Sequence, residues 1–419
     1  MKNIIQLTAA SFLLILLPLT ASAQENADTL RESAVDVFID CWRCDMNYIR
    51  EEIPYVNYVR DVKEADVYIL QTTQSAGSGG QEYTFTFIGQ DEFEGKNDTL
   101  VYYSNPDDTY DITRENTTRM LSMGLMRYVA RTPMFAEVEI QHLGVSTIEE
   151  AVDKWNYWVF EIEMDPDFEL EESRKSMNWD NSFSASRVTS KLKYEFDADM
   201  RFRRTTYKYE DTTYVRDRNS WSLDNLIVKS ISEHWSAGGR VNLSSTTYRN
   251  LRAGFRFTPA VEYNIFPYSQ STRRQLRMLY GLGYVYNNYI DTTIFNKTEE
   301  HLFEQSLNIA YQVQQKWGSV NISLEASSYL HDLSKNRIEL DGRLNIRIFK
   351  GLSLSLNGGV AKINNQISLP KGDLDEAEIL LELQELQTAY SIEGGIGFTY
   401  TFGSIYNNIV NPRFGRGRY

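Results

Sequence analysis

Histidine and cysteine are scarce in this sequence, whose 419 residues include only 4 His and 2 Cys. This scarcity leaves little material for a metal site built from His and Cys ligands. Basic residues are outnumbered too: 43 Lys and Arg face 57 Asp and Glu, for a formal net charge of −14. A basic face for nucleic acid is therefore not expected. We expect no nucleic-acid partner, no metal and no other cofactor.

Long apolar runs are also missing from most of the chain. Beyond the N-terminal segment there is no run of about 18 apolar residues, so a membrane protein built from helices is not expected. A β-barrel membrane protein is not excluded, because the apolar and polar residues of an alternating strand average out in a hydropathy window. Aromatic residues make up 13% of the chain, which is too many for a disordered protein.

The N-terminal segment has the three parts of a secretory signal peptide. Lys2 supplies a positive charge, residues 12–19 form an apolar core, and residues 21–23 are small, as cleavage requires. We expect a signal peptide over residues 1–23 and a mature chain that starts at Gln24. An uncleaved membrane anchor is the alternative.

Residues 24–150 have the pattern of a small α/β domain, which we expect in the periplasm. Asp45 is a suitable cap for a short helix that Pro54 would end, and a later helix carries an apolar stripe that includes Leu121 and Leu125. The expected order is β-α-β-β-β-α. The strands are predicted at residues 35–39, 65–73, 83–88 and 99–103, the helices at residues 45–53 and 107–131, and a hairpin turn at residues 77–80.

From about residue 154 onward, apolar and polar residues alternate over long stretches, which is typical of strands with two different faces. In residues 192–202, even-numbered positions are apolar and odd-numbered positions are charged. Such alternation fits either a soluble antiparallel sheet or a transmembrane barrel. Charges on the polar face, aromatic residues near segment ends and strands longer than the usual ~5–6 residues favour the barrel.

Twelve strands are expected within residues 151–402, an even number as in bacterial single-chain barrels. They are predicted at residues 154–168, 178–187, 191–205, 218–230, 235–246, 251–265, 275–290, 301–314, 318–330, 336–349, 351–366 and 388–402. A short helix is predicted in the connection of residues 370–387.

The connections between these strands differ in length. Those near residues 188–190, 231–234, 315–317 and 350 are short, and those near residues 169–177, 206–217, 291–300 and 367–387 are longer. Short turns belong on the periplasmic side of a barrel. This alternation of short and long connections places the α/β domain and a tail of residues 403–419 in the periplasm, below an all-β transmembrane barrel of about twelve antiparallel strands.

A CxxC motif formed by Cys41 and Cys44 lies between the first expected strand and the first expected helix. Thioredoxin-like proteins place their redox motif at such a point, because a helix N-terminus lowers the pKa of a thiol. Here Asp40 and Asp45 flank the motif and disfavour a thiolate, and an oxidising periplasm favours a local disulfide. A local disulfide, free thiols and a redox-active pair all remain open.

Two further sets of residues are candidates for function. His331 and Asp332, with Ser327, Ser328 and Ser334 nearby, suit either a hydrolase site at the outer rim of the barrel or an ordinary surface histidine. Charged residues are expected to face the lumen, where they would line a narrow channel or form a plug of salt bridges. These charges are Arg201, Arg203, Arg252, Arg256, Glu262, Glu339, Asp341, Arg343, Arg347 and Glu393.

Residues 261–275, 349–353 and 402–414 resemble segments of uncharacterised outer-membrane barrel proteins of Bacteroidota-type bacteria. The last strand, with Gly397 and alternating aromatic residues up to Phe402, is similar to the signal for assembly into the outer membrane. The β-α-β-β-β-α order of the first domain, with residues 65–70 as an inner strand, is similar to that of the amino-terminal domain of TolB and of the periplasmic core of CsgG and LpoB. These resemblances imply location, fold and a module for protein contacts.

We therefore expect an outer-membrane protein rather than an enzyme. Its barrel, surrounded by outer-membrane lipid, would be an anchor or a narrow channel, and its first domain would contact a periplasmic protein. A hydrolase at the barrel rim and a thiol–disulfide module tethered by a barrel are the alternatives.

Overall fold

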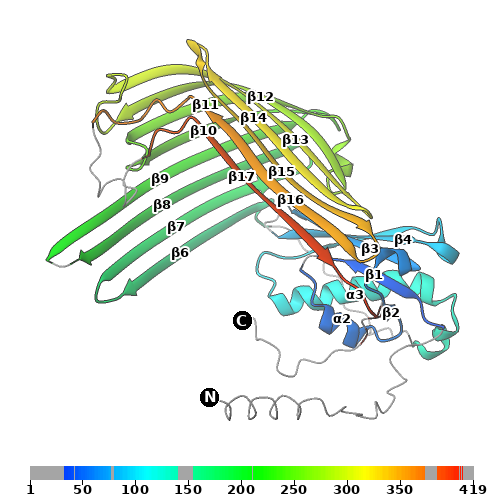
Figure 1. Cartoon of the computed structure of the whole chain (residues 1–419). Helices are drawn as coiled ribbons and strands as arrows, with labels where there is room; N and C mark the ends of the chain where they lie inside the picture. Colours follow the sequence, from blue (N-terminus) through cyan, green and yellow to red (C-terminus); the bar gives the residue numbers. More distant parts are fainter. Residues whose placement is uncertain are drawn as a thin grey trace, which may run out of the picture.

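The structure is a computed structural model with two parts, a small α/β domain and a large antiparallel sheet (Figure 1). It describes residues 33–139, 154–372 and 385–408, apart from residues 42, 77–79, 210, 405 and 407. The predicted signal peptide lies outside the described residues, as do most of the predicted hairpin turn, most of the helix at residues 370–387 and most of the tail. No described helix is long and apolar enough to span a membrane.

The α/β domain contains a five-stranded mixed sheet in the order β2-β1-β3-β4-β5. Its strands are β1 (Asp36–Asp40), β2 (Asn57–Tyr58), β3 (Val67–Ser75), β4 (Gln81–Gly89) and β5 (Asp98–Tyr103), and its helices are α2 (Met46–Glu52) and α3 (Tyr110–Val129). β1 pairs in parallel with β2 and β3, whereas β3, β4 and β5 are antiparallel. The predicted elements are all present, and β2 is an additional short strand.

Both helices pack on one face of this sheet. The Asp45 side chain accepts hydrogen bonds from the first turn of α2, and Thr109 accepts one from the first turn of α3. The core between helices and sheet includes Leu125 and Phe87, both fully buried. Gly124 lets α3 approach closely, because a Cβ there would lie 2.1 Å from the Phe87 ring.

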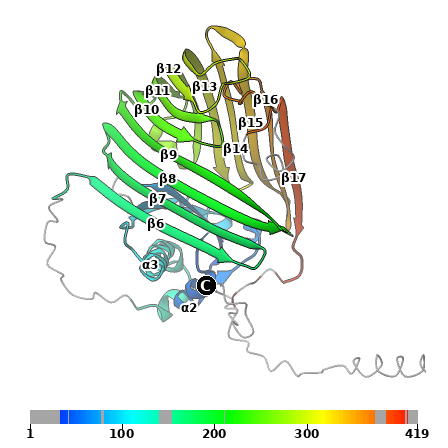
Figure 2. The same ribbon diagram turned by 90° about the vertical axis from the view of Figure 1, so that its left-hand side faces the viewer.

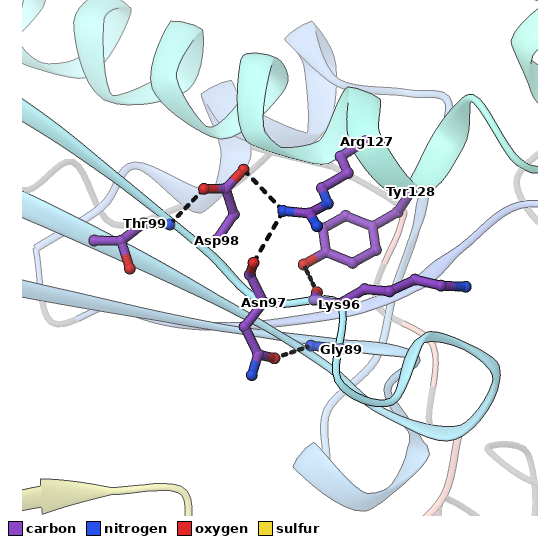
Figure 3. A network of polar contacts seen from close by, with 7 residues as sticks. All are labelled: Gly89, Lys96, Asn97, Asp98, Thr99, Arg127 and Tyr128. Atoms are coloured by element: carbon purple, nitrogen blue, oxygen red, sulfur yellow. Dashed lines mark hydrogen bonds and ion pairs between the residues drawn. The ribbon is translucent and has the colours of Figure 1, made fainter.

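The C-terminal turn of α3 is fastened to the connection between β4 and β5 (Figure 3). The Arg127 guanidinium donates to the Asn97 carbonyl at 2.9 Å and pairs with Asp98 at 3.3 Å. The Tyr128 hydroxyl donates to the Lys96 carbonyl at 2.6 Å. These contacts fix the long helix against the sheet edge.

The second part is a single sheet of twelve antiparallel strands, as predicted, in which each strand pairs with its neighbours along the chain. The strands are β6 (Trp158–Leu170), β7 (Arg174–Val188), β8 (Leu192–Tyr209), β9 (Thr212–Ser230), β10 (Trp235–Thr246), β11 (Leu251–Asn264), β12 (Arg274–Tyr289), β13 (Glu299–Gln315), β14 (Gly318–Tyr329), β15 (Asp332–Phe349), β16 (Leu352–Ile363) and β17 (Tyr390–Tyr400).

Two of the predicted long connections are wrong. Strands β6 to β9 extend into residues 169–177 and 206–217, so that β8 ends at Tyr209 and β9 begins at Thr212. The pairing continues because backbone hydrogen bonds between strands do not need an apolar face. The prediction missed this because it followed apolar alternation alone.

One face of the large sheet is apolar from β6 to β17. Cross-strand pairs on this face include Ile162 with Phe183, Leu223 with Leu243, Val261 with Tyr280, Ile309 with Leu324, and Leu354 with Phe398. Many of these side chains are exposed: Ile162 is 69% exposed and Phe398 is 67% exposed. Nine of the ten predicted lumen charges occupy the alternate positions, on the opposite, polar face. The tenth, Arg252, lies at a register shift of β11, where the alternation is interrupted.

The expected closed barrel is not present, because the sheet is open. Within the described residues β6 pairs only with β7 and β17 only with β16, and Figure 2 shows β6 and β17 at opposite margins of the curved sheet. Alternation determines which face each residue occupies, but not how strongly the whole sheet curves. The sequence pattern therefore could not distinguish an open sheet from a closed one.

Candidate functional site: the interface between the domain and the large sheet

The best-defined polar contacts between distant parts of the chain join the α/β domain to the turns at one end of the large sheet. Arg347, near the end of β15, forms an ion pair of 2.8 Å with Asp40, the last residue of β1. The Tyr68 hydroxyl donates to the same carboxylate at 2.9 Å, and the Arg347 guanidinium lies 5.2 Å from the centre of the Phe38 ring. Arg347 was predicted to face the lumen, yet its partner belongs to the other domain.

Two short turns of the large sheet add further contacts. In the turn between β13 and β14, the Lys316 ammonium donates to the Gln90 side chain at 2.9 Å. Burial lowers the pKa of Lys316. In the turn between β15 and β16, Lys350 pairs with Glu64 and the Gly351 N–H donates to Asp61 at 2.7 Å.

These turns cover the face of the small sheet that the helices leave free. Tyr68 is fully buried and Leu70 is 1% exposed, although both lie outside the main core. Burial is the main cause that raises the pKa of Tyr68, and the negative charge of the Asp40 carboxylate raises it further. The small sheet is thus packed between two helices on one face and the turns of the large sheet on the other.

The chain after β17 returns to the same domain. Tyr406 forms an antiparallel bridge with Val59, next to the edge strand β2. The Tyr58 N–H donates to the Asn408 side chain at 2.6 Å, and the Asn408 amide donates to Asn57 at 3.0 Å. The domain and the end of β17 therefore meet at one end of the large sheet. The predicted alternation of short and long connections requires this arrangement, with the domain and the tail on the same side.

The CxxC motif forms a disulfide between Cys41 and Cys44. The pair lies between Asp40, which binds Arg347, and Asp45, which caps α2. Cys44 also lines a cavity of about 560 Å³ between α3 and the ends of β3 and β4. A local disulfide was one of the alternatives that the sequence left open for this motif. It lies between the interface with the large sheet and the first helix of the domain.

The predicted lumen charges are spread over the polar face and do not gather in one site. Several have partners: Arg203 with Asp180, Arg256 with Glu304, Glu262 with Arg277, and Glu339 with Arg337. The Arg252 guanidinium donates to the Ile290 carbonyl. Arg201 lines a hollow over β7 to β10, while Asp341, Arg343 and Glu393 line another hollow across β13 to β17.

The residues proposed for a hydrolase do not form a catalytic arrangement. The Ser334 hydroxyl donates to Asp332 at 2.6 Å, while the His331 ring lies near Tyr329. Within the part of the chain that the structure describes, no hydrogen bond links His331 to a serine, and no three His, Cys, Asp or Glu side chains are grouped to hold a metal ion.

No family model matches this chain, and no curated protein matches its sequence.

The sequence did not point to the other residues of the interface, because the partner of each lies more than two hundred residues away. These residues are Asp61, Glu64, Gln90, Lys316 and Lys350.

Proposed function

We propose that this protein is an outer-membrane anchor for its α/β domain. In the bilayer the large sheet closes into a barrel, and the domain is held at its periplasmic end, where it contacts a periplasmic protein. The observation that carries the proposal is the contact of Arg347 with Asp40 and Tyr68, since it attaches the domain directly to the end of β15.

The apolar face of the large sheet supports a membrane location. It extends across all twelve strands, and the exposed side chains include Ile162, Ile396 and Phe398. A continuous apolar surface of this kind marks a membrane or a protein contact. Full charges occupy the other face, as expected for the water-facing side of a barrel wall.

Closure of the sheet follows from the chemistry of the bilayer. Unpaired backbone N–H and C=O groups at a sheet edge have no water to bind in the hydrocarbon core, so a spanning sheet must have no free edge. Apolar residues on β6 and on β17 belong to the same face. Antiparallel pairing of the two edges would therefore continue both faces without interruption.

Cysteine cross-linking in lipid vesicles tests this closure. Ile162→Cys on β6 is combined in turn with Ile392→Cys, Ile396→Cys or Phe398→Cys on β17. Directly opposed residues of antiparallel strands have Cβ atoms about 4.5–5.5 Å apart, close to the spacing of a disulfide. We expect an intramolecular disulfide in at least one combination, detected as a shift in gel mobility that reductant reverses.

The control pairs Glu163→Cys with Ile396→Cys, which lie on opposite faces and should not cross-link. Cross-linking of this control as efficiently as the test pairs would contradict an ordered edge. Covalent dimers in place of the intramolecular product would contradict closure, because the edges would then pair with a second copy.

A narrow channel is a second candidate, which the charged polar face favours. Asp341, Arg343 and Glu393 carry no ion pair within the described residues, so they are suited to face water. Single-channel recording in a planar bilayer tests this candidate. Discrete conductance steps would support a channel, and a folded but silent protein would leave the anchor as the function.

A further inference from the structure

The polar face of the large sheet has a cavity near the end opposite the α/β domain. Its volume is about 550 Å³, and its wall is formed by strands β9 to β15 together with residues 365–368 and Glu385. Arg249, in the connection after β10, and Tyr329, at the end of β14, place the cavity beside the connections at that end of the sheet.

One wall of this cavity is a segment of chain that follows β16 and folds onto the polar face. Ile367 is 4% exposed and packs with Val285, Leu302 and Tyr329. The Ile294 N–H donates to the Leu369 carbonyl at 2.9 Å, and the Asn250 amide donates to the Ser368 carbonyl at 2.9 Å. The wall is thus held by an apolar cluster and by backbone hydrogen bonds.

The carboxylates of the cavity already have donors from the protein. The Asn242 amide donates to Asp224 at 3.0 Å, and the Gln366 amide donates to Glu385 at 2.7 Å. Glu304, 9% exposed, pairs with Arg256 at 3.3 Å. The negative charges of the lining are therefore satisfied by hydrogen bonds or an ion pair.

Two guanidinium groups of the same lining differ in this respect. Arg240 on β10 and Arg249 after β10 have neither an ion pair nor a hydrogen bond among the residues that the structure describes. A guanidinium presents five donors in a planar fork that matches carboxylate and phosphate groups. The cavity thus offers exposed guanidinium groups without a hydrogen-bond partner, of which Arg240 is also attracted by the Asp197 carboxylate, beside neutral amides such as Asn287 and Asn365.

We propose that this cavity binds a small polar solute that carries an oxyanion, with Arg240 and Arg249 as the residues that hold it. Asn287 and Asn365 offer hydrogen bonds to the rest of the solute. The volume of about 550 Å³ is within the range of small-molecule sites. The site is a property of the folded sheet and does not depend on the proposed membrane location.

Isothermal titration calorimetry with the full chain in detergent micelles tests the proposal. The probes are galacturonate, inorganic phosphate and, as a neutral counterpart, galactose. We expect saturable binding of galacturonate or phosphate with a Kd of about 1 mM or tighter, and at least tenfold weaker binding of galactose. Binding of phosphate alone would identify the oxyanion as the main determinant, and preference for galacturonate would add a sugar-like body.

Substitutions then locate the site. The double variant Arg240→Gln with Arg249→Gln should weaken binding at least tenfold, and Arg240→Lys with Arg249→Lys should retain part of it. The control is Arg343→Gln, which removes another unpaired guanidinium from the same face but outside the cavity. Absence of binding by both anions in the folded wild-type protein would overturn the proposal, and so would equal losses in the double variant and the control.

Discussion

Arg347 on β15 and Asp40 on β1 are 307 positions apart in the sequence, yet their side chains form an ion pair of 2.8 Å. Their side chains are only 29% and 26% exposed, and the Tyr68 hydroxyl donates to the same carboxylate. A pair that is largely shielded from water depends on both partners, since loss of one leaves the other charge uncompensated. This relationship connects the two parts of the chain.

Replacing Arg347 with methionine should loosen the domain on the sheet. Asp40 would lose its charged partner, at a cost of about 1.5–3 kcal/mol for a hydrogen bond to a charged group. Hydrogen exchange of the full chain should show faster exchange in β1 and β3. Arg343→Met is the matched control, because Arg343 lies on the same strand and face without an ion pair within the described residues. Similar hydrogen exchange of β1 and β3 in both variants would contradict the conclusion that Arg347 holds the domain on the sheet.

Replacing Asn408 with alanine should free the edge of the small sheet. The Tyr58 N–H and the Asn57 side chain would each lose a partner, at about 1 kcal/mol for each hydrogen bond. Exchange of the Tyr58 amide should then rise, while exchange in β5, at the other edge, should stay unchanged. A uniform rise over the whole domain would argue for global destabilisation instead.

The stability of the α/β domain should depend on pH through Asp36 and Asp66. Burial is the main cause that raises the pKa of both carboxyl groups. The negative charges of Asp66 and Glu64 raise the pKa of Asp36 further, and those of Asp91 and Glu92 raise the pKa of Asp66 further. Between the usual carboxyl pKa of about 3.9 and the raised value, the folded state binds more protons than the unfolded state. The free energy of unfolding should therefore fall as pH rises through this window.

Asp66→Asn should flatten this dependence, because its amide oxygen still accepts from the Asp36 N–H but carries no charge. Hydrogen exchange of β1 and β3 over the acidic range measures the slope. Asp107→Asn, on an exposed turn, is the control. An unchanged slope in Asp66→Asn would rule out this carboxyl as its source.

Reduction of the disulfide should affect α2 more than the interface. The Cys41–Cys44 bond closes a very short loop, for which chain entropy gives about 2 kcal/mol. Reductant, or Cys44→Ser, should speed exchange at the start of α2, which Asp45 caps, and leave β3 protected. Release of the whole domain from the sheet would show that the disulfide, rather than Arg347, holds the interface.

The sequence predicted the local pattern well and the long-range contacts poorly. Alternation placed twelve strands and assigned residues such as Arg256 and Glu393 to the polar face, because side chains of a strand alternate by a simple geometric rule. Nothing local could indicate that Arg347 meets Asp40, or that Lys316 reaches Gln90, since these contacts depend on how two domains pack. Similarly, the disulfide state of Cys41 depends on geometry that spacing alone does not determine.

Lipid exposure on alternate residues tests the proposed membrane anchor most directly. Leu340→Cys and Asp341→Cys, which are neighbours on β15, are each labelled with an environment-sensitive fluorophore in vesicles that contain brominated lipid. The native cysteines are paired and do not compete for label. We predict strong quenching at position 340 and weak quenching at position 341, with the same contrast between Ile322→Cys and Asn321→Cys on β14. Equal quenching on both faces, or none on either, would contradict a sheet that crosses the bilayer with its apolar face in lipid.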